Sequence, residues 1–277
     1  MVERFSVLVL NEIFPAGLAR LPEPRYEVGK DIARPDAVLL RSADMHALDI
    51  PASVLAVARA GAGTNNIPVA ALSARGVPVF NAPGANANAV KELVLAGMLL
   101  AARNLAPALR FVAGLEATPD IEARVEAGKK SFAGFEIAGH TLGIVGLGKV
   151  GCLVADAAIK LGMEVCGYDP HITIDAAWSL PAQVRRAASV ADVLRQNQFV
   201  TLHVPLVDTT RDLVNADNIA QMRPGAVLLN FAREGVVSES AVLAALSAGR
   251  LAWYVCDFPS PALLHHERVI ALPHLAH

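Results

Sequence analysis

The chain has 277 residues, which is enough for two domains of ordinary size, each with a hydrophobic core of its own. Hydrophobic residues make up 54% of the sequence and charged residues 18%, and 24 basic side chains nearly balance 26 acidic ones. This composition excludes an intrinsically disordered chain and argues against a basic surface for nucleic acid. It leaves a small molecule as the expected partner.

The mean hydropathy of +0.42 raises the question of a membrane protein. The most apolar stretch, residues 93–102, has only ten residues and is flanked by Lys91, Glu92 and Arg103. Because a bilayer span takes about 20 residues, this stretch predicts a buried core helix, and no membrane partner is expected. The apolar run 5–10 is too short for a signal peptide and lacks a cleavage site, which favours a cytoplasmic protein.

The cysteines Cys152, Cys166 and Cys256 are odd in number and show no CxxC spacing. Neither a disulfide framework nor a thiolate zinc site is indicated, and no metal site is expected. We interpret all three as small core residues.

Short apolar runs at residues 7–10, 37–40, 55–58 and 77–80 are rich in Val, Leu and Ala and predict buried strands of a small parallel α/β layer. Good helix formers then predict one long helix over 86–104, after the loop 82–84. We place the domain boundary there, which gives domains 1–85 and 86–277.

A second series of six strands is predicted in the larger domain, separated by helical segments. Such alternation predicts a doubly wound sheet. The strands are expected at 141–145, 164–168, 199–204, 226–230, 253–256 and 269–272. A helix is expected over 238–248, with Ser238 as its N-cap and Gly249 as the C′ residue.

The first strand of this series is followed by a GxGxxG motif, Gly146-Leu147-Gly148-Lys149-Val150-Gly151, and then by the helical segment 152–161. Glycines allow a tight turn and a close approach of the backbone, and the helix N-terminus offers unpaired N–H groups to a pyrophosphate. The motif alone is weak evidence, but the strand before it and the helix after it are the required context.

An acidic residue, Asp169, follows the next strand. There a carboxylate would accept hydrogen bonds from the ribose hydroxyls and repel a 2′-phosphate, which predicts NAD rather than NADP. Asp169-Pro170 also suits an ordinary strand-ending turn.

Two further residues, Arg233 and His274, follow the strands 226–230 and 269–272. In a parallel sheet both would lie at the carboxyl edge, where doubly wound sheets bind ligands. A cation for a substrate carboxylate and an acid or base for a hydroxyl proton are what nicotinamide chemistry needs from a protein. Each residue alone would more often be ordinary, and their joint placement favours a functional role.

With these residues the sequence resembles the D-isomer-specific 2-hydroxyacid dehydrogenase family over essentially its whole length. Besides the glycine motif, the landmarks are Arg41-Ser42-Ala43, residues 59–67, residues 81–92, His203-Val204-Pro205, Asn230-Phe231-Ala232-Arg233 and Pro273-His274-Leu275. The resemblance implies a Rossmann-type NAD domain and a smaller flavodoxin-like α/β substrate domain. It also implies NAD-dependent oxidation of a D-2-hydroxy acid.

The landmarks are most similar to the branch of the family that oxidises D-3-phosphoglycerate to 3-phosphohydroxypyruvate, the first step of serine biosynthesis. In that case Arg41 and Arg59 would favour a phosphorylated substrate; the alternative is that both are solvated charges at strand ends. The resemblance further implies a homodimer or higher homo-oligomer, which we place around helix 86–104.

The family's roles can be assigned residue by residue. Arg233 resembles the arginine that binds the substrate carboxylate and carbonyl, and His274 resembles the general acid and base. The cofactor-binding positions are Ala62, Gly146, Gly148, Lys149, Val150, Gly151, Asp169, His203, Val204, Pro205, Phe231, Ala232, Arg233, Asp257 and His274. The substrate-binding positions are Arg41, Ser42, Arg59, Ala60, Gly61, Asn86 and Arg233.

Two departures from the family stand out. The family carries a glutamate that orients the histidine and raises its pKa, but the stretch 257–264 has no carboxylate near Pro261-Ala262, and the next acid is Glu267. The family also continues into a helix that returns to the substrate domain, whereas this sequence ends at His277.

Two other functions stay open. One is oxidation or reduction of a different D-2-hydroxy or 2-keto acid. The other, which the absent glutamate motivates, is a non-catalytic NAD(H)-sensing protein similar to the corepressors that resemble this family.

Overall fold

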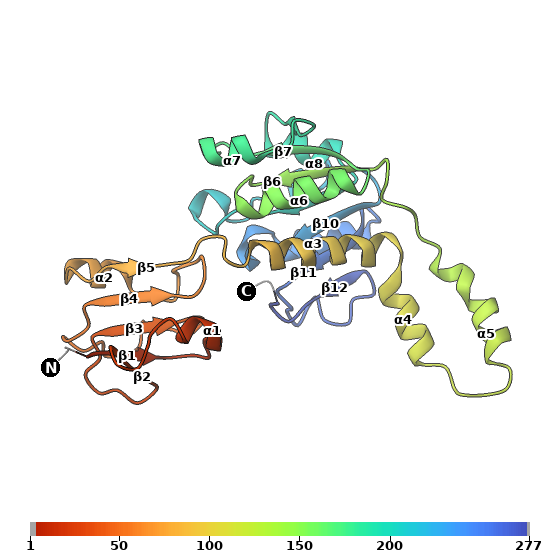
Figure 1. Cartoon of the computed structure of the whole chain (residues 1–277). Helices are drawn as coiled ribbons and strands as arrows, with labels where there is room; N and C mark the ends of the chain where they lie inside the picture. Colours follow the sequence, from red (N-terminus) through yellow and green to blue (C-terminus); the bar gives the residue numbers. More distant parts are fainter. Residues whose placement is uncertain (1–3, 276–277) are drawn as a thin grey trace. The chain divides into compact units, whose positions relative to one another are not determined.

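The computed structural model describes residues 4–275, and the chain divides into two compact units, residues 1–86 and 87–277. Each unit is built around its own parallel sheet (Figure 1). The predicted fold class, a doubly wound α/β domain with a second, smaller α/β domain, is confirmed.

Unit 1 contains five parallel strands in the order β2-β1-β3-β4-β5, the strand order of a flavodoxin-like sheet. They are β1 (Phe5–Val9), β2 (Tyr26–Gly29), β3 (Ala37–Leu40), β4 (Ala56–Arg59) and β5 (Val79–Phe80), accompanied by the short helices α1 (Pro15–Leu18) and α2 (Val69–Ala74). The sequence missed β2, because its residues form no continuous apolar run and none of them is fully buried.

Unit 2 contains seven parallel strands in the order β12-β11-β10-β9-β6-β7-β8. They are β6 (Thr141–Val145), β7 (Glu164–Tyr168), β8 (Arg185–Arg186), β9 (Phe199–Leu202), β10 (Ala226–Asn230), β11 (Leu251–Cys256) and β12 (Val269–Ala271). All six predicted strands are present. The edge strand β8 escaped prediction because it consists of two exposed arginines. The strand order reverses between β6 and β9, which is where such sheets bind ligands.

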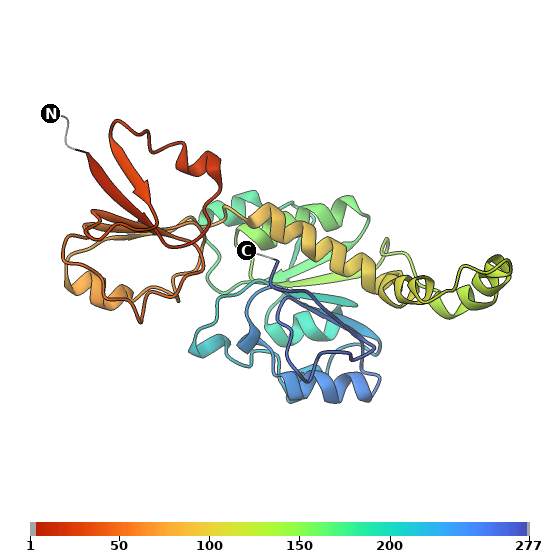
Figure 2. The ribbon, with the colours of Figure 1, turned by 90° about the horizontal axis from the view of Figure 1, so that it is seen from below.

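Side chains of this sheet alternate between two cores. Phe199 and Leu229 face the cluster that contains residues of α3 (Ala87–Ala102) and α6 (Lys149–Lys160). Val200 and Leu228 face the opposite cluster, with residues of α8 (Val190–Gln196), α9 (Ala216–Ile219) and α10 (Glu239–Ser247). Figure 2 shows the sheet between these two layers of helices. Burial on both faces explains why the strands are nearly continuous apolar runs.

The long predicted helix ends earlier than expected. After α3 the chain turns at Asn104, which has a φ of 49°, into α4 (Leu105–Ala113), followed by α5 (Ile121–Gly128) and the 3-10 turn η1 (Lys129–Phe132). Figure 1 shows α4 and α5 projecting beyond the sheet of unit 2. Across residues 4–275 we find no single helix long and apolar enough to cross a bilayer. Only α3 and α4 together pass on length and composition, and they are bent by 72°.

Helix termini in unit 2 follow the predicted signals in part. Ser238 is the N-cap of α10 and Gly249 follows its end with a φ of 68°, but the Ser238 hydroxyl contacts Ser240 Oγ and does not cap the helix. Helix α6 begins at Lys149, three residues earlier than predicted, so that Gly148 is its N-cap. The three cysteines are free and buried, which confirms them as core residues.

The remaining short elements of unit 2 lie in the connections between strands. They are α7 (Ile174–Ser179), η2 (Asp208–Thr210) and η3 (Glu234–Val236).

Gly143 in β6 tests how tightly the sheet packs against α8. A Cβ atom at this position would lie 2.5 Å from Val193 Cγ1 and 2.7 Å from Asn197 Nδ2. We expect Gly143→Ala to lower the free energy of unfolding by about 2 kcal/mol, because an extra methyl group in a filled core forces side chains from their rotamers. The change is measured as a lower Tm. Gly114→Ala, whose Cβ would meet only ordinary contacts at 3.5 Å, is the control. Equal Tm values for the two variants would contradict the close packing.

Candidate functional site

The predicted site residues of unit 2 gather at one edge because all seven strands run in the same direction. Each strand except β8 is followed by at least one of them. They are Gly146 after β6, Asp169 after β7, His203 after β9, Phe231 to Arg233 after β10, Asp257 after β11 and His274 after β12.

The glycine motif forms the turn from β6 into α6. Gly146 has a φ of 94°, and a Cβ there would lie 2.5 Å from the carbonyl oxygen of His203. At Gly151 a Cβ would lie 2.1 Å from the carbonyl oxygen of Gly146. Above Gly148, by contrast, a Cβ would meet nothing within 4 Å. The first and third glycines are therefore required by packing, and the second leaves open space at the helix N-terminus.

Asp169 connects this turn to the next strand. One of its carboxylate oxygens accepts a hydrogen bond from the backbone N–H of Leu147 at 2.9 Å, and the other accepts from the N–H of His171 at 2.8 Å. The Leu147 side chain packs over Gly167 of β7. The carboxylate thus lies beside the glycine turn, as the prediction of a ribose-binding acid requires.

These features fit a dinucleotide. The open space at Gly148, together with the N-terminus of α6, suits a pyrophosphate. Lys149 and Val150 are the first residues of this helix. The negative charge of Asp169 suits the ribose hydroxyls of NAD and would repel the 2′-phosphate of NADP.

His203 lies on the far side of the glycine turn, with Val204 and Pro205 next to it. Its backbone N–H donates to the Val145 carbonyl at 2.7 Å, and its Nε2 lies 3.0 Å from Thr201 Oγ1. Burial lowers the pKa of His203 to about 3. The imidazole is therefore neutral at physiological pH and cannot act as the acid of a reduction.

The loop that carries Arg233 is shaped by Asn230, the last residue of β10, which sequence reasoning quoted in a motif but did not select. This residue is fully buried. Its Oδ1 accepts from the N–H of Ala232 at 3.1 Å, and its Nδ2 donates to the carbonyl of Arg233 at 2.9 Å. An asparagine at the end of an otherwise apolar buried strand is the signal that could have identified it.

Arg233 is half-buried, and its backbone is extended. Its Nη1 donates a hydrogen bond to the Ala232 carbonyl at 2.6 Å. Burial lowers the pKa of its guanidinium, which stays charged at neutral pH. Across residues 4–275 we find no ion pair that includes Arg233, so its charge is available to an anionic ligand.

His274 lies near Arg233 and Asp257. It has a φ of 57°, and its ring packs against Phe258 with the ring centres 5.1 Å apart. Burial lowers the pKa of His274, the charge of Asp257 raises it, and the charge of Arg233 lowers it. The structure thus brings Arg233, Asp257 and His274 together.

Asp257 is the carboxylate that acts on His274. It is fully buried, and its Oδ1 accepts a hydrogen bond from the N–H of Leu275 at 2.8 Å. Glu267, the nearest acid downstream, instead pairs with Arg268 at 3.8 Å on the surface. In the stretch with the missing glutamate, Ser260 donates to Glu239 of α10 at 2.5 Å.

The predicted residues of unit 1 form a second group. Arg41 and Ser42 follow β3, and Arg59 ends the neighbouring strand β4, so they lie at the carboxyl edge of the unit 1 sheet. Arg59 donates from Nε to the Arg41 carbonyl at 2.8 Å. Ala60, Gly61 and Ala62 continue this edge, where Asn81 donates to the Ala62 carbonyl at 2.7 Å, and Asn86 is the last residue of the unit.

No group of three or more His, Cys, Asp or Glu side chains that could hold a metal ion occurs among residues 4–275.

Comparison with known proteins matches residues 95–276 to the model of the D-isomer specific 2-hydroxyacid dehydrogenase, NAD binding domain. Hydroxypyruvate reductase of Thermotoga maritima is 33% identical over 261 residues, which cover 90% of this chain and 80% of the relative. D-3-phosphoglycerate dehydrogenase of Methanocaldococcus jannaschii is 35% identical over 224 residues, which cover 79% of this chain and 40% of the relative. The chain thus spans less than half the length of the latter.

Among solved structures, the apo form of Rhodotorula graminis D-mandelate dehydrogenase superimposes with a TM-score of 0.81 and 25% identity, covering 99% of this chain and 88% of that one. The chain belongs to the D-isomer-specific 2-hydroxyacid dehydrogenase family and carries the NAD-binding domain of that family.

Proposed function

We propose that this protein catalyses the NAD-dependent oxidation of D-3-phosphoglycerate to 3-phosphohydroxypyruvate and the reverse reduction, as a cytoplasmic enzyme of serine biosynthesis. The observation that carries the chemistry is the placement of Arg233 and His274 together at the edge of the sheet that holds the glycine turn. Relatives with the name D-3-phosphoglycerate dehydrogenase, at about one third identity, support the choice of substrate.

The two residues divide the work on the substrate. The Arg233 guanidinium binds the carboxylate of the 2-keto acid and draws electron density toward the neighbouring carbonyl oxygen. The protonated His274 donates its proton to that oxygen in the reduction, and the neutral His274 removes the hydroxyl proton in the oxidation. NAD, held at the glycine turn, would supply the hydride acceptor for C2 in the oxidation, and NADH would supply the hydride donor in the reduction.

The charge of Asp257 takes part in this proton transfer. Burial and Arg233 both favour a neutral His274, and Asp257 opposes them. The pKa of His274 is lowered overall, mainly by burial, and in a chain that lacks the family's glutamate the charge of Asp257 is the one that favours the protonated form.

Arg41 and Arg59 supply positive charge for the phosphate group of the substrate. Arg41 is exposed at the end of β3, whereas Arg59 uses its Nε on the Arg41 carbonyl. We assign direct phosphate binding to Arg41 and a supporting role to Arg59.

A second candidate is a dehydrogenase for an unphosphorylated 2-hydroxy acid. The hydrogen bond from Arg59 Nε to the Arg41 carbonyl favours this second candidate, because Arg59 then has fewer donors left for a phosphate. The relative with the name hydroxypyruvate reductase points in the same direction.

We further propose a homodimer. Helix α3 was expected at the centre of the dimer because it is apolar around most of its circumference. Its apolar residues instead pack against α6 and the sheet of the same chain, so they need no second copy to cover them. The exposed apolar face lies on α4 instead, where Leu105, Leu109 and Val112 recur at helical spacing and are 41%, 66% and 58% exposed. Pairing of this face between two copies would remove it from water.

The substrate is tested with steady-state rates over a panel of 2-keto acids with NADH. We expect turnover of 3-phosphohydroxypyruvate, and a loss of at least about a hundredfold in kcat for His274→Ala because the proton donor is gone. Arg41→Ala should raise the KM for 3-phosphohydroxypyruvate about tenfold and leave that for hydroxypyruvate unchanged. Arg20→Ala, an exposed arginine elsewhere in unit 1, is the control. Turnover of unphosphorylated acids alone would establish the second candidate, and no turnover of any acid would refute the enzyme.

The role of Asp257 is tested with the pH dependence of kcat/KM for reduction. Reduction requires protonated His274, so activity falls as the pH rises through the pKa of His274. Asp257→Asn removes the charge that raises this pKa, so the fall should occur at lower pH than in the wild type. Glu267→Gln, which alters only a surface ion pair, should leave the profile in place. An unchanged profile in Asp257→Asn would show that Asp257 does not act on His274.

The dimer is tested with light scattering. We expect a mass of two chains for the wild type and a mass of one chain for Leu109→Glu, because a charge would be buried in the interface. Trp178→Glu replaces an exposed apolar residue on α7 and should leave the mass unchanged. A wild-type mass of one chain would refute the proposal.

A further inference from the structure

The segment Arg41–Ala43 is held by the side chains of two asparagines, Asn11 and Asn66. The sequence assigned neither of them a role, although Asn66 lies within the family landmark 59–67. Asn11 follows the end of β1 by two residues, and Asn66 lies in the connection between β4 and α2. Both are far from the segment in sequence, yet both contact its backbone. We call this pair the asparagine clamp.

Asn11 binds the donors of the segment. Its Oδ1 accepts from the N–H of Arg41 at 3.2 Å and from the N–H of Ala43 at 2.6 Å. One acceptor atom thus satisfies two backbone donors that no strand partner occupies.

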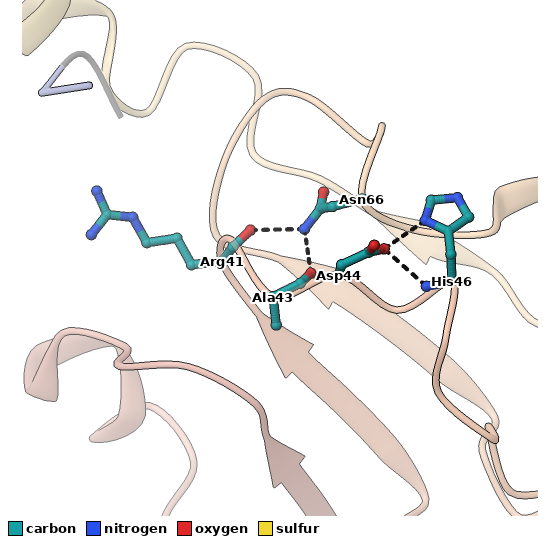
Figure 3. Close-up of polar contacts among 5 residues, drawn as sticks. All are labelled: Arg41, Ala43, Asp44, His46 and Asn66. Atoms are coloured by element: carbon teal, nitrogen blue, oxygen red, sulfur yellow. Dashed lines mark hydrogen bonds and ion pairs between the residues drawn. The ribbon is translucent and has the colours of Figure 1, made fainter. Parts of the chain in front are cut away.

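Asn66 binds the acceptors of the same two residues. Its Nδ2 donates to the carbonyl of Arg41 at 3.2 Å and to the carbonyl of Ala43 at 2.7 Å, as Figure 3 shows. The backbone carbonyl of Asn66 also accepts from the N–H of Met45 at 2.8 Å, and Met45 is buried in the unit 1 core. The segment is therefore tied to the core on one side.

The orientation of the Asn66 amide is informative. Its Oδ1 is buried and has no hydrogen-bond partner in the described part of the chain. Leaving an acceptor unsatisfied costs free energy, so the amide orientation is determined by the two carbonyls. A carboxylate in this place would turn oxygen toward oxygen and repel both.

The clamp fixes residues 41 and 43 and leaves Ser42 between them. Figure 3 shows the Arg41 side chain extending away from Asp44 and His46. Asp44 is engaged locally, because it accepts from the backbone N–H of His46 at 3.0 Å and lies 2.6 Å from His46 Nδ1. Asp44, the acidic side chain closest in sequence to Arg41, is thus engaged with His46.

We propose that Asn11 and Asn66 are positioning residues that hold the Arg41–Ala43 backbone so that Arg41 presents its guanidinium to the anionic end of the substrate. This inference rests on the proposed function in its assignment of Arg41 to the substrate. Neither asparagine touches the ligand, and both act through Arg41.

The test compares Asn66→Ala and Asn66→Asp with Asn65→Asp, which adds the same charge at the exposed neighbouring residue. We expect both Asn66 variants to raise the KM for 3-phosphohydroxypyruvate about tenfold, the aspartate more than the alanine, with little change in kcat or in the KM for NADH. Asn11→Ala should behave like Asn66→Ala, and Asn65→Asp like the wild type.

A double-mutant cycle separates positioning from general destabilisation. If Asn66 acts through Arg41, then Asn66→Ala has no further effect on KM when Arg41 is already alanine. Additive effects, or an equal loss in kcat and in NADH binding, would overturn the proposal.

Amide hydrogen exchange tests the asparagine clamp independently of whether the proposed substrate is correct. We expect Asn66→Ala and Asn11→Ala to accelerate amide exchange at residues 41–45 at least tenfold and to leave β1 and β3 unchanged. Unchanged exchange overturns the clamp whatever the substrate. Accelerated exchange in a protein that does not turn over 3-phosphohydroxypyruvate supports the clamp and refutes only the proposed substrate.

Discussion

The uniform direction of the seven strands in unit 2 is the constraint on which the site depends. Parallel strands bring every following loop to one edge, so residues separated by more than a hundred positions meet without any special contact between their loops. Burial of this sheet by helices on both faces makes the arrangement rigid. The chemistry then requires only that a few polar residues follow the strands.

We propose two functions for these polar residues, cofactor binding and proton transfer, at the same edge. The glycine turn and Asp169 surround the open end of α6, and Arg233 and His274 follow the strands on the other side of the switch point. Asn230 couples the core to this chemistry, since its buried amide binds the loop that carries Arg233. Removing a residue of this kind would disturb the reacting groups without touching a ligand.

Sequence reasoning found the strands that are buried on both faces, because a short, continuous apolar run such as that of β10 is typical of a strand covered by helices on both sides. It missed β2, a short, partly buried edge strand, and β8, a short, exposed one, because each is defined by pairing with a neighbouring strand rather than by an apolar run. It selected Asp169, Arg233 and His274 because each follows a predicted strand. It assigned no role to Asn11 or Asn66, since an amide that binds a distant backbone leaves no periodic pattern.

The hydrogen bond between Asp169 and the Leu147 N–H has a consequence for redesign of the cofactor preference. The carboxylate proposed to repel a 2′-phosphate also accepts a hydrogen bond from the turn above which the pyrophosphate is expected. A neutral or basic residue in place of Asp169 would accommodate the 2′-phosphate, but it would also remove the acceptor for the Leu147 N–H in the glycine turn. In this protein, exchange of one nicotinamide cofactor for the other therefore calls for a compensating donor or acceptor at the turn, and a single substitution at Asp169 would gain tolerance at the expense of affinity.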